Sequence, residues 1–363
     1  MSIALTENTT LHPLALPQAG AAPTPMVRTY ADVRNRSIRD VTGRGDDDLT
    51  AESLLPILRS NADTTKRQWC IMAGDEMVGV APLSILADGG GETAILIISL
   101  LKHVWGRGIG SAALPHLEDE ARKAGVCRLL VWVEHPSTGS GSKTLASPTG
   151  FGDIPLDHAA RFLSRHGYTL EQVERVSTLD WSDRQIQNIT DLRAEAESKA
   201  VGYRVVQWML PTPAEHVAGY AWMKEHMSTD VPDADLAMPA EKWDAERITR
   251  HDERYLQRGN CVLVTAAQHV DTGELCAYNE LAIGPDRAEV SHQEDTLVLA
   301  SHRGNRLGML VKATGLASWR ELHPDSSTVI TYNAEENRPM LDINEALGFA
   351  PISYEGAWKK ELT

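Results

Sequence analysis

The sequence predicts an α/β chain with two similar units, each a mixed, mostly antiparallel sheet flanked by helices. Three observations lead to this prediction. The chain has 363 residues, more than one ordinary core accommodates. Segments with helical and strand periodicity alternate along it, and one arrangement of strand, glycine turn and helix occurs twice. The length therefore suits two domains of about 150 to 180 residues each.

The clearer of the two strand–turn–helix arrangements is the second along the chain, in residues 297–311. An apolar strand stops at a polar turn, and an apolar pattern with helical spacing follows. A turn that opens directly into a helix directs backbone N–H groups at one place and adds the positive end of the helix dipole. Anions bind readily there. Arg303 and Arg306 add charged donors, which suit a diphosphate better than a single carboxylate.

The same arrangement occurs earlier, with an apolar strand at 94–101, a glycine turn at 105–111 and a helical pattern to 124. One glycine turn is a weak signal, because a tight β-to-α connection also needs residues such as Gly108 and Gly110 for its backbone geometry. Two anion-binding turns in one chain indicate a duplicated unit.

The remaining elements follow in the same order in both halves. The Pro-rich start, residues 1–26, predicts a disordered leader. The first unit, 27–182, is expected to contain helices at 30–41 and 49–58, hairpin strands at 68–73 and 77–83, the strand and turn above, a strand at 129–133, a helix from 157 and a strand at 172–179.

An amphipathic helical pattern at 183–202 predicts a connecting helix, with packing on the first unit as the alternative. The second unit, 203–363, repeats the plan. Its expected elements are a strand at 203–209, helices at 213–227 and 239–258, hairpin strands at 261–268 and 275–283, the second turn, a strand at 328–332 and a helix at 337–347.

Composition narrows the function classes. The formal charge of −15 argues against nucleic acid as a partner and favours cationic small molecules. No apolar run approaches the roughly 20 residues that span a bilayer, and no signal peptide is indicated, so a cytoplasmic protein without a membrane partner is expected. The four cysteines and thirteen histidines are dispersed, which predicts free thiols and no metal site.

The full order of strand, (Arg/Gln)-x-x-Gly-x-(Gly/Ala), helix, strand and helix ending in Gly-Phe resembles the GNAT superfamily of acyl-CoA-dependent N-acyltransferases. Because the match comes in two copies, the chain resembles a tandem GNAT protein of the type common in actinobacteria. The resemblance implies two GNAT-like domains and acetyl-CoA as the acyl donor. In that family the turn holds the pyrophosphate of the coenzyme, and the strand before it presents backbone groups to the pantetheine arm.

By position, the resemblance assigns coenzyme binding to the following residues of the second unit: Leu297, Val298, Leu299, Arg303, Gly304, Asn305, Arg306, Leu307, Gly308, Met309, Asn333 and Asn337. The corresponding residues of the first unit are Ile98, Leu100, Trp105, Gly106, Arg107, Gly108, Ile109, Gly110 and Ser111. Each copy departs from the motif once. Trp105 replaces the family's arginine or glutamine, and Arg306 replaces its middle glycine. For Asn333 and Asn337 the alternative is a strand-end or helix-cap role.

Acyl transfer from a thioester to an amine needs a base, because an ammonium with a pKa near ~10 is not a nucleophile. The candidates are Glu280, inside an apolar strand, and Glu294 and Asp295, just before the coenzyme strand. Burial among Leu and Ile would raise the pKa of a carboxyl and suit it to this role. The alternative for each is a solvated strand residue, and His292 is a further option.

Many family members carry a tyrosine general acid five residues before the Phe of Gly-Phe, where this chain has Asn344 and Leu163. The resemblance therefore gives neither copy a tyrosine to protonate the thiolate. The first unit has no carboxylate near its coenzyme strand, although Glu134 and His135 end its fifth strand. We therefore expect the second unit to be active and the first to bind coenzyme without turnover or to serve as a scaffold.

Three functions compete at this stage. The first is an acetyl-CoA-dependent N-acetyltransferase acting on a primary amine of a small molecule, as a monomer or homodimer. The second is a non-catalytic acyl-CoA-binding, sensing or scaffold protein with degenerate sites, which the missing tyrosines favour. The third, a Rossmann nucleotide-binding pair, is disfavoured because no acidic residue follows the turn at the spacing that holds a ribose.

Overall fold

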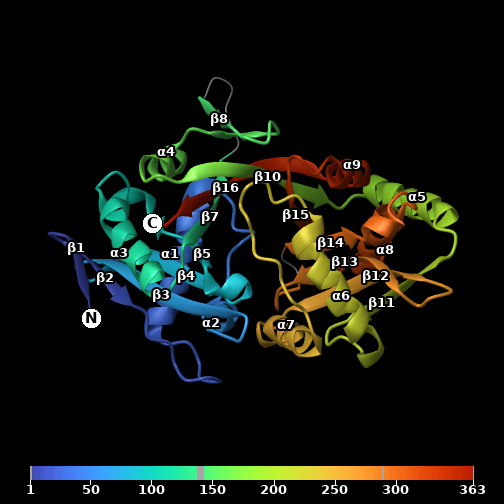
Figure 1. The fold of residues 1–363 in the computed structure, drawn as a ribbon, viewed down its shortest axis with the longest axis horizontal. Helices are drawn as coiled ribbons and strands as arrows, with labels where there is room; N and C mark the ends of the chain where they lie inside the picture. The colour runs from blue at the N-terminus through green and yellow to red at the C-terminus, as the bar shows by residue number, and fades with distance from the viewer. Residues whose placement is uncertain (1, 137–142, 288–289, 363) are drawn as a thin grey trace. The chain divides into compact units, whose positions relative to one another are not determined.

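The computed structural model describes residues 2–136, 143–287 and 290–362. The chain divides into two compact units (Figure 1). Unit 1 comprises residues 1–173, 234–239 and 353–363, and unit 2 comprises residues 174–233 and 240–352. The mixed α/β architecture that the sequence predicts is confirmed, with a mostly antiparallel sheet flanked by helices in each unit.

The sheet of unit 1 has the strand order β1-β2-β3-β4-β5-β7-β16, with the short β6 beside β4. Neighbours are antiparallel except β5 and β7, which run parallel. The strands are β1 (Ile3–Thr6), β2 (Thr9–Pro13), β3 (Thr64–Ala73), β4 (Glu76–Leu86), β5 (Thr93–Leu96), β6 (Ser99–Leu100), β7 (Arg128–His135) and β16 (Ala350–Glu361), and a separate ribbon pairs β8 (Thr144–Ala146) with β9 (Asp153–Pro155).

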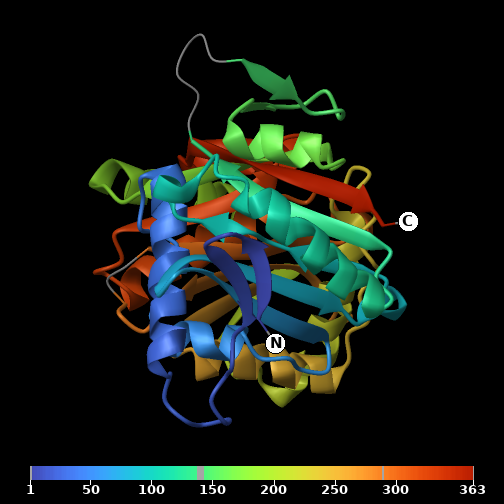
Figure 2. The same cartoon turned by 90° about the vertical axis from the view of Figure 1, so that its left-hand side faces the viewer.

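Helices cover both faces of this sheet, because alternate residues of its strands are buried on opposite sides. In β3, Cys70 packs with α1 (Pro25–Thr42) and α2 (Ala51–Ile57), whereas Ile71 packs with α3 (Ile109–Lys123) and α4 (His158–Arg165). Local signals set the helix starts. The Thr24 and Thr50 hydroxyls accept the N-terminal N–H bonds of α1, seen as the long blue helix in Figure 2, and α2.

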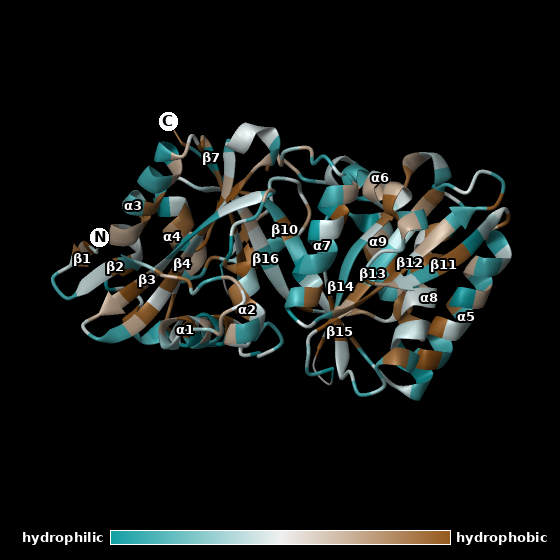
Figure 3. Cartoon of the chain, turned by 90° about the horizontal axis from the view of Figure 1, so that it is seen from below, coloured by the Kyte–Doolittle hydropathy of each residue, from teal (hydrophilic) through white to brown (hydrophobic). Residues whose placement is uncertain are grey.

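Unit 2 has the strand order β10-β15-β14-β13-β12-β11, in which only β14 and β15 run parallel among the pairs described. Apolar residues, brown in Figure 3, recur along β12 and β13 and form its centre. The strands are β10 (Thr169–Asp180), which enters this unit from residue 174, β11 (Tyr203–Met209), β12 (Cys261–His269), β13 (Leu275–Ile283), β14 (Ser291–Val298) and β15 (Thr328–Ala334).

Two layers of helices also cover the sheet of unit 2. One face carries α6 (Ala214–Asp230) and α7 (Ala245–Gln257). The other carries α5 (Asp183–Lys199), α8 (Leu307–Leu322) and α9 (Arg338–Leu347). Along β13, Tyr278 and Ala282 face α6 and α7, and Leu281 faces α8. The strand alternation therefore places Glu280 on the face of α6 and α7.

The structure corrects two predictions about the ends and boundaries of the units. The predicted disordered leader at 1–26 is wrong for residues 3–13, because β1 and β2 form a hairpin whose second strand pairs with β3 from Thr9 to Pro13. The predicted boundaries at 182 and 203 also fail. Helix α5 belongs to unit 2 and packs on α8, while the chain's last strand pairs with β7 in unit 1. Of the described helices, none is long and apolar enough to cross a membrane.

One lysine is buried in the apolar layer of unit 2. Lys312, in the middle of α8, is 1% exposed, and its ammonium lies 5.8 Å from the centre of the Phe349 ring. Burial lowers the pKa of Lys312 to about 7. The Lys312 side chain binds a proton less tightly in the folded protein than in the unfolded chain. It therefore destabilises the folded state at every pH at which the unfolded chain is protonated at this lysine.

We expect Lys312→Met to raise the free energy of unfolding by roughly 4 kcal/mol at pH 7. The gain should shrink as the pH rises from 7 toward the ordinary lysine pKa, where the unfolded state also loses its proton. Urea unfolding at several pH values measures this, with Lys199→Met on the exposed side of α5 as the matched control. A gain that is absent, or independent of pH, would show that the buried amine is not the cause.

Candidate functional site

The strands β14 and β15 separate after a short paired stretch. Their parallel pairing covers Ser291, His292 and Gln293 of β14, and among the described residues the remainder of β14 does not pair with β15. On its other edge β14 stays paired with β13, with an irregularity opposite Glu280. Backbone groups of β14 from residue 294 onward therefore face an opening in the sheet, where an extended ligand can pair with them.

The polar turn lies where β14 ends. A short 3-10 turn, η3 (Ala300–His302), leads through Gly304 to α8, whose N-terminus has no side-chain cap. Arg303 donates its Nε–H to the Val298 carbonyl at 3.2 Å and keeps an exposed guanidinium. The first N–H groups of α8, at Leu307, Gly308 and Met309, thus combine with nearby arginines into an anion site.

The backbone of this turn comes close to its neighbours. A Cβ on Gly308 would lie 2.9 Å from Ile343 Cδ1, so a larger residue there would require the end of the Ile343 side chain to shift. Arg306 has φ 60°, the left-handed region that Gly108 occupies in unit 1 with φ 79°. Arg306 replaces the glycine without changing the turn, at a cost of about 1 kcal/mol in backbone strain.

The corresponding turn of unit 1 has the same construction. Strand β5 pairs with β7 only at Thr93, Ala94 and Ile95, and the turn η2 (Lys102–Val104) leads through Gly106 and Gly108 to an uncapped α3. Trp105 donates its indole N–H to the Leu100 carbonyl at 2.8 Å. This is the bond that Arg303 makes in unit 2, so Trp105 keeps the positioning donor and loses only the charge.

The remaining turn residues of unit 1 lie between η2 and the first turn of α3. Arg107 is exposed beside the helix start, and Ile109 is buried in the core. Ser111 is hydrogen-bonded to His166 Nε2 at 2.9 Å, and a Cβ on Gly110 would meet the Phe162 ring at 3.2 Å. Ile98 and Leu100 pack against the core, so they have backbone groups rather than side chains to offer a ligand.

A buried ion cluster lies beside the irregularity of β14 in unit 2. Lys224, from α6, is 5% exposed, and its Nζ lies 2.8 Å from Glu280 and 2.8 Å from Asp295. Tyr220 donates its hydroxyl hydrogen to Glu280, and Tyr278 donates to Asp295 at 3.2 Å. The alternative that Glu280 is a solvated strand residue is wrong, because it is 1% exposed.

Aromatic rings surround the same ammonium. Lys224 Nζ lies 5.6, 5.7 and 5.5 Å from the ring centres of Tyr220, Trp243 and Tyr278. Aromatic faces attract a cation within about 6 Å, and the Asp295 carboxylate adds its charge. The cluster is thus a site that stabilises a primary ammonium group.

The two carboxyls of the cluster differ in their pKa values. Burial, with the neighbouring Asp295 and Glu294 charges, raises the pKa of Glu280 well above its usual range. Burial also acts on Asp295, but the Lys224 ammonium and its hydrogen bond hold the pKa of Asp295 below its usual value. One ammonium cannot neutralise two carboxylates, so the pair shares its proton unequally.

The other residues that the sequence suggested for the base or for coenzyme binding are not members of this ion cluster. Glu294 is exposed, and its charge helps raise the pKa of Tyr255 on α7. His292 lies within the paired part of β14. Asn333 accepts a hydrogen bond from Asn344 Nδ2 at 2.7 Å. Asn337 starts α9, although its side chain does not cap the helix.

The end of the fifth strand in unit 1 is more buried than we expected. Glu134 is bonded by Arg44 and Ser353, and burial raises its pKa despite Arg44. His135 is fully buried, and its Nδ1–H donates to the Asp157 carboxylate at 3.0 Å. Both units thus hold a carboxylate in an ion pair, but Glu134 is 11% exposed and Asp295 is 38% exposed, so the carboxylate of unit 2 is the easier one for a ligand to reach.

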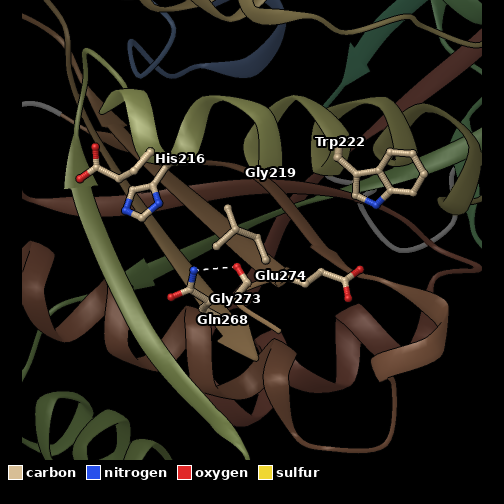
Figure 4. A pocket seen from close by; sticks show the side chains of 8 residues that line it. His216, Gly219, Trp222, Gln268, Gly273 and Glu274 are labelled. Atoms are coloured by element: carbon tan, nitrogen blue, oxygen red, sulfur yellow. Dashed lines mark hydrogen bonds between the residues drawn. The ribbon is translucent and has the colours of Figure 1, made fainter. Parts of the chain in front are cut away.

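A hollow of about 440 Å³ lies beside the β12–β13 hairpin of unit 2. Figure 4 shows residues of α6, His216 and Trp222 among them, above Gln268, Gly273 and Glu274 of the hairpin. Gln268 donates to the Gly273 carbonyl at 2.7 Å and closes the hairpin end. Two glutamates, Glu215 and Glu274, line the hollow, so it suits a cationic ligand.

Sequence reasoning missed Lys224, Tyr220, Tyr278 and Trp243. Lys224 stands in a helix among Trp222, Met223 and Met227, where a charged residue ordinarily faces water. The available signal was the strand alternation that puts Tyr278 and Glu280 on one face of β13, since a buried carboxylate requires a partner. Nothing in the sequence indicates which helix supplies that partner.

Comparison with known proteins identifies this architecture. The family model described as acetyltransferase (GNAT) family matches residues 35–141, within unit 1. A solved tandem GNAT protein from the clavulanic acid biosynthesis pathway has the same fold, with a TM-score of 0.71 and 24% identity over 97% of this chain and 98% of that chain.

Residues 35–141 thus match the GNAT family model, and the whole chain has the fold of a tandem GNAT protein. A GCN5-related N-acetyltransferase from Sphaerobacter thermophilus is also similar, with a TM-score of 0.60 and 13% identity over 96% of this chain and 97% of that chain. No curated protein sequence matches. The two turns, the divergent strands and these comparisons support acyl-CoA-dependent acetyl transfer as the general activity of the fold.

We expect two substitutions at Arg306 to separate strain from charge. Arg306→Gly removes both the strained backbone and the guanidinium, whereas Arg306→Ala removes the guanidinium only. Both variants should weaken binding of acetyl-CoA in calorimetry by a similar factor, roughly 3- to 10-fold for one lost exposed charge contact. Only Arg306→Gly should raise the free energy of unfolding, by about 1 kcal/mol in urea unfolding. Equal stability of the two variants would contradict the strain assigned to this residue.

Proposed function

We propose that this tandem GNAT protein transfers the acetyl group of acetyl-CoA to a primary amine of a small molecule, with the reaction in unit 2. The observation that carries the proposal is the ammonium cluster beside the open edge of β14. There the carboxyl groups of Glu280 and Asp295 and three aromatic rings surround the Lys224 ammonium. A substrate amine binds as an ammonium and needs the same surroundings.

The chain's residues fit the coenzyme at the opening and the turn. The edge of β14 from residue 294 would hold the pantetheine arm, and the start of α8 with Arg303 and Arg306 would hold the diphosphate. Bound acetyl-CoA supplies a thioester, whose acyl carbon takes the amine while its carbon–sulfur bond breaks. The thiol of the leaving group has a pKa of about 8.5, so the thiolate leaves without a proton from a general acid. This agrees with the presence of Asn344 where many family members have a tyrosine.

Asp295 is the group that we assign to the amine. Its side chain is 38% exposed, whereas Glu280 is 1% exposed and held by Tyr220 and Lys224. Asp295 remains ionised and holds the ammonium. Because Asp295 is the carboxyl of the pair that stays ionised, it also accepts the proton that the amine loses. The four free cysteines fit a reducing compartment for the reaction.

A second function deserves testing because Lys224 already fills the ammonium site. If Lys224 stays in place when coenzyme binds, unit 2 has no room for a substrate amine at this cluster. The chain would then bind acyl-CoA without turnover. The unpartnered Asn344 Oδ1 among the described residues, in place of the family's tyrosine, favours the same alternative.

The two functions differ in one experiment. Calorimetric titration with acetyl-CoA, followed by a thiol-release assay over a panel of small primary amines, should show binding and release with at least one amine. Asp295→Asn should lower kcat/KM by about 10² to 10⁴-fold, the usual range for a lost general base. Glu134→Gln in unit 1 is the matched control and should leave turnover intact.

Three outcomes would contradict the proposal in distinct ways. Binding without thiol release on any amine supports the non-catalytic protein. Loss of turnover in Glu134→Gln with a fully active Asp295→Asn moves the reaction to unit 1. Failure to bind acetyl-CoA removes both functions.

A further inference from the structure

The fold of unit 2 gathers three ligand-type side chains that lie far apart in the sequence. Glu274 and Cys276 come from the start of β13, and His302 comes from η3, immediately before the coenzyme turn. One ligand atom of each lies within 4.8 Å of the others. His302 Nε2 and Glu274 Oε2 are 3.7 Å apart. The dispersed cysteines and histidines therefore concealed this cluster from sequence analysis.

We propose that Glu274, Cys276 and His302 form a binding site for a zinc ion. Thiolate, imidazole and carboxylate together are a ligand set that Zn²⁺ accepts. A tetrahedral ion at its usual bond lengths holds ligand atoms roughly 3.3 to 3.8 Å apart. The separation of His302 and Glu274 already meets this, and a side-chain movement of about an ångström brings in the sulfur.

The surroundings of His302 support this assignment. The Tyr203 hydroxyl lies 2.8 Å from His302 Nδ1, and Asn305 Nδ2 lies 3.5 Å from the same hydroxyl. When His302 Nδ1–H donates to Tyr203, its Nε2 carries the lone pair and points to Glu274. A metal-binding histidine usually has such a partner on its other nitrogen, which fixes the tautomer and the ring.

The site also has a rigid base and an approach from solvent. Leu299 N–H donates to the Cys276 carbonyl at 3.0 Å, and His302 N–H donates to the Leu299 carbonyl at 2.9 Å, so backbone bonds connect the two segments. Cys276 is fully buried, whereas the Glu274 side chain is 45% exposed. Glu274 also lines the hollow beneath α6 (Figure 4), so its carboxylate is the part of the site that solvent reaches.

Three protein ligands leave a fourth position for water or an external ligand. On binding, the ion takes the place of the Cys276 thiol proton, and one proton is released to solvent. The ion would join the β12–β13 hairpin to the segment that precedes Arg303. It would therefore stiffen the coenzyme turn from outside the acyl-transfer site, whether or not the chain is an active acetyltransferase.

Cobalt(II) titration of the metal-free full chain, kept reduced by a phosphine, tests the site through its absorption spectrum. We expect a thiolate-to-cobalt charge-transfer band in the near ultraviolet with one equivalent bound, and its loss when Zn²⁺ is added. Cys276→Ser should abolish the band. Cys261→Ser on the neighbouring β12 is the matched control and should keep it.

Further variants guard against misfolding of a core substitution. Glu274→Gln changes a partly exposed residue, and His302→Gln keeps a polar side chain, so neither should disturb the core. Each should weaken cobalt binding by more than 100-fold. Tyr203→Phe removes only the supporting bond and should weaken it by about 10- to 100-fold. Circular dichroism of each variant checks the fold. Absence of the band in the wild-type chain, or the same band and affinity in Cys276→Ser and Glu274→Gln, overturns the proposal.

Discussion

The site of unit 2 depends on the separation of two parallel strands. β14 and β15 pair over three residues and then diverge, while β13 continues to hold the other edge of β14. Backbone groups in a sheet need partners, so an open edge inside a protein is a place for an extended ligand. The same separation of β5 and β7 recurs in unit 1. In each unit the divergent strand ends in a turn at the start of a helix, which aligns an arm-binding edge with an anion site.

Electrostatics then distinguish the two units. In unit 2 the irregularity of β14 brings Asp295 to Lys224 and Glu280, and only one cation serves two carboxyls. In unit 1 the comparable carboxylate, Glu134, is matched by Arg44. Removing one partner of a buried ion pair lowers the free energy of unfolding by about 3 to 5 kcal/mol, so Lys224 contributes to the stability of unit 2. Glu280 and Asp295, with their different pKa values, remain available for proton transfer.

The sequence predicted most elements because their signals are local. Hairpins at 68–83 and 261–283, the glycine turns and the helices that begin near Thr50 and Asp157 all depend on residues near one another. The failures are non-local. β14 begins at Ser291 with polar residues, β16 lacks a clear period, and β2 leads into a Pro-rich segment, so each is a strand only because a neighbour pairs with it.

Part of the candidate site could also be predicted from local sequence signals, and part could not. The turn residues and the carboxylates Glu280 and Asp295 could be chosen from spacing and apolar context. Their partner Lys224 and the Cys276–His302 proximity could not, because both depend on how α6 and the hairpin pack against distant strands. The equivalence of Trp105 and Arg303 also required the structure, since an indole N–H and a guanidinium look unrelated in sequence.

A crystal structure of the full chain grown with acetyl-CoA tests the central claim most directly. The account predicts the coenzyme's diphosphate at the start of α8, with its pantetheine arm bonded to the backbone of β14 beyond residue 293 and its thioester toward Asp295. Coenzyme bound elsewhere on unit 2, or absent from both turns at saturating concentration, would contradict it.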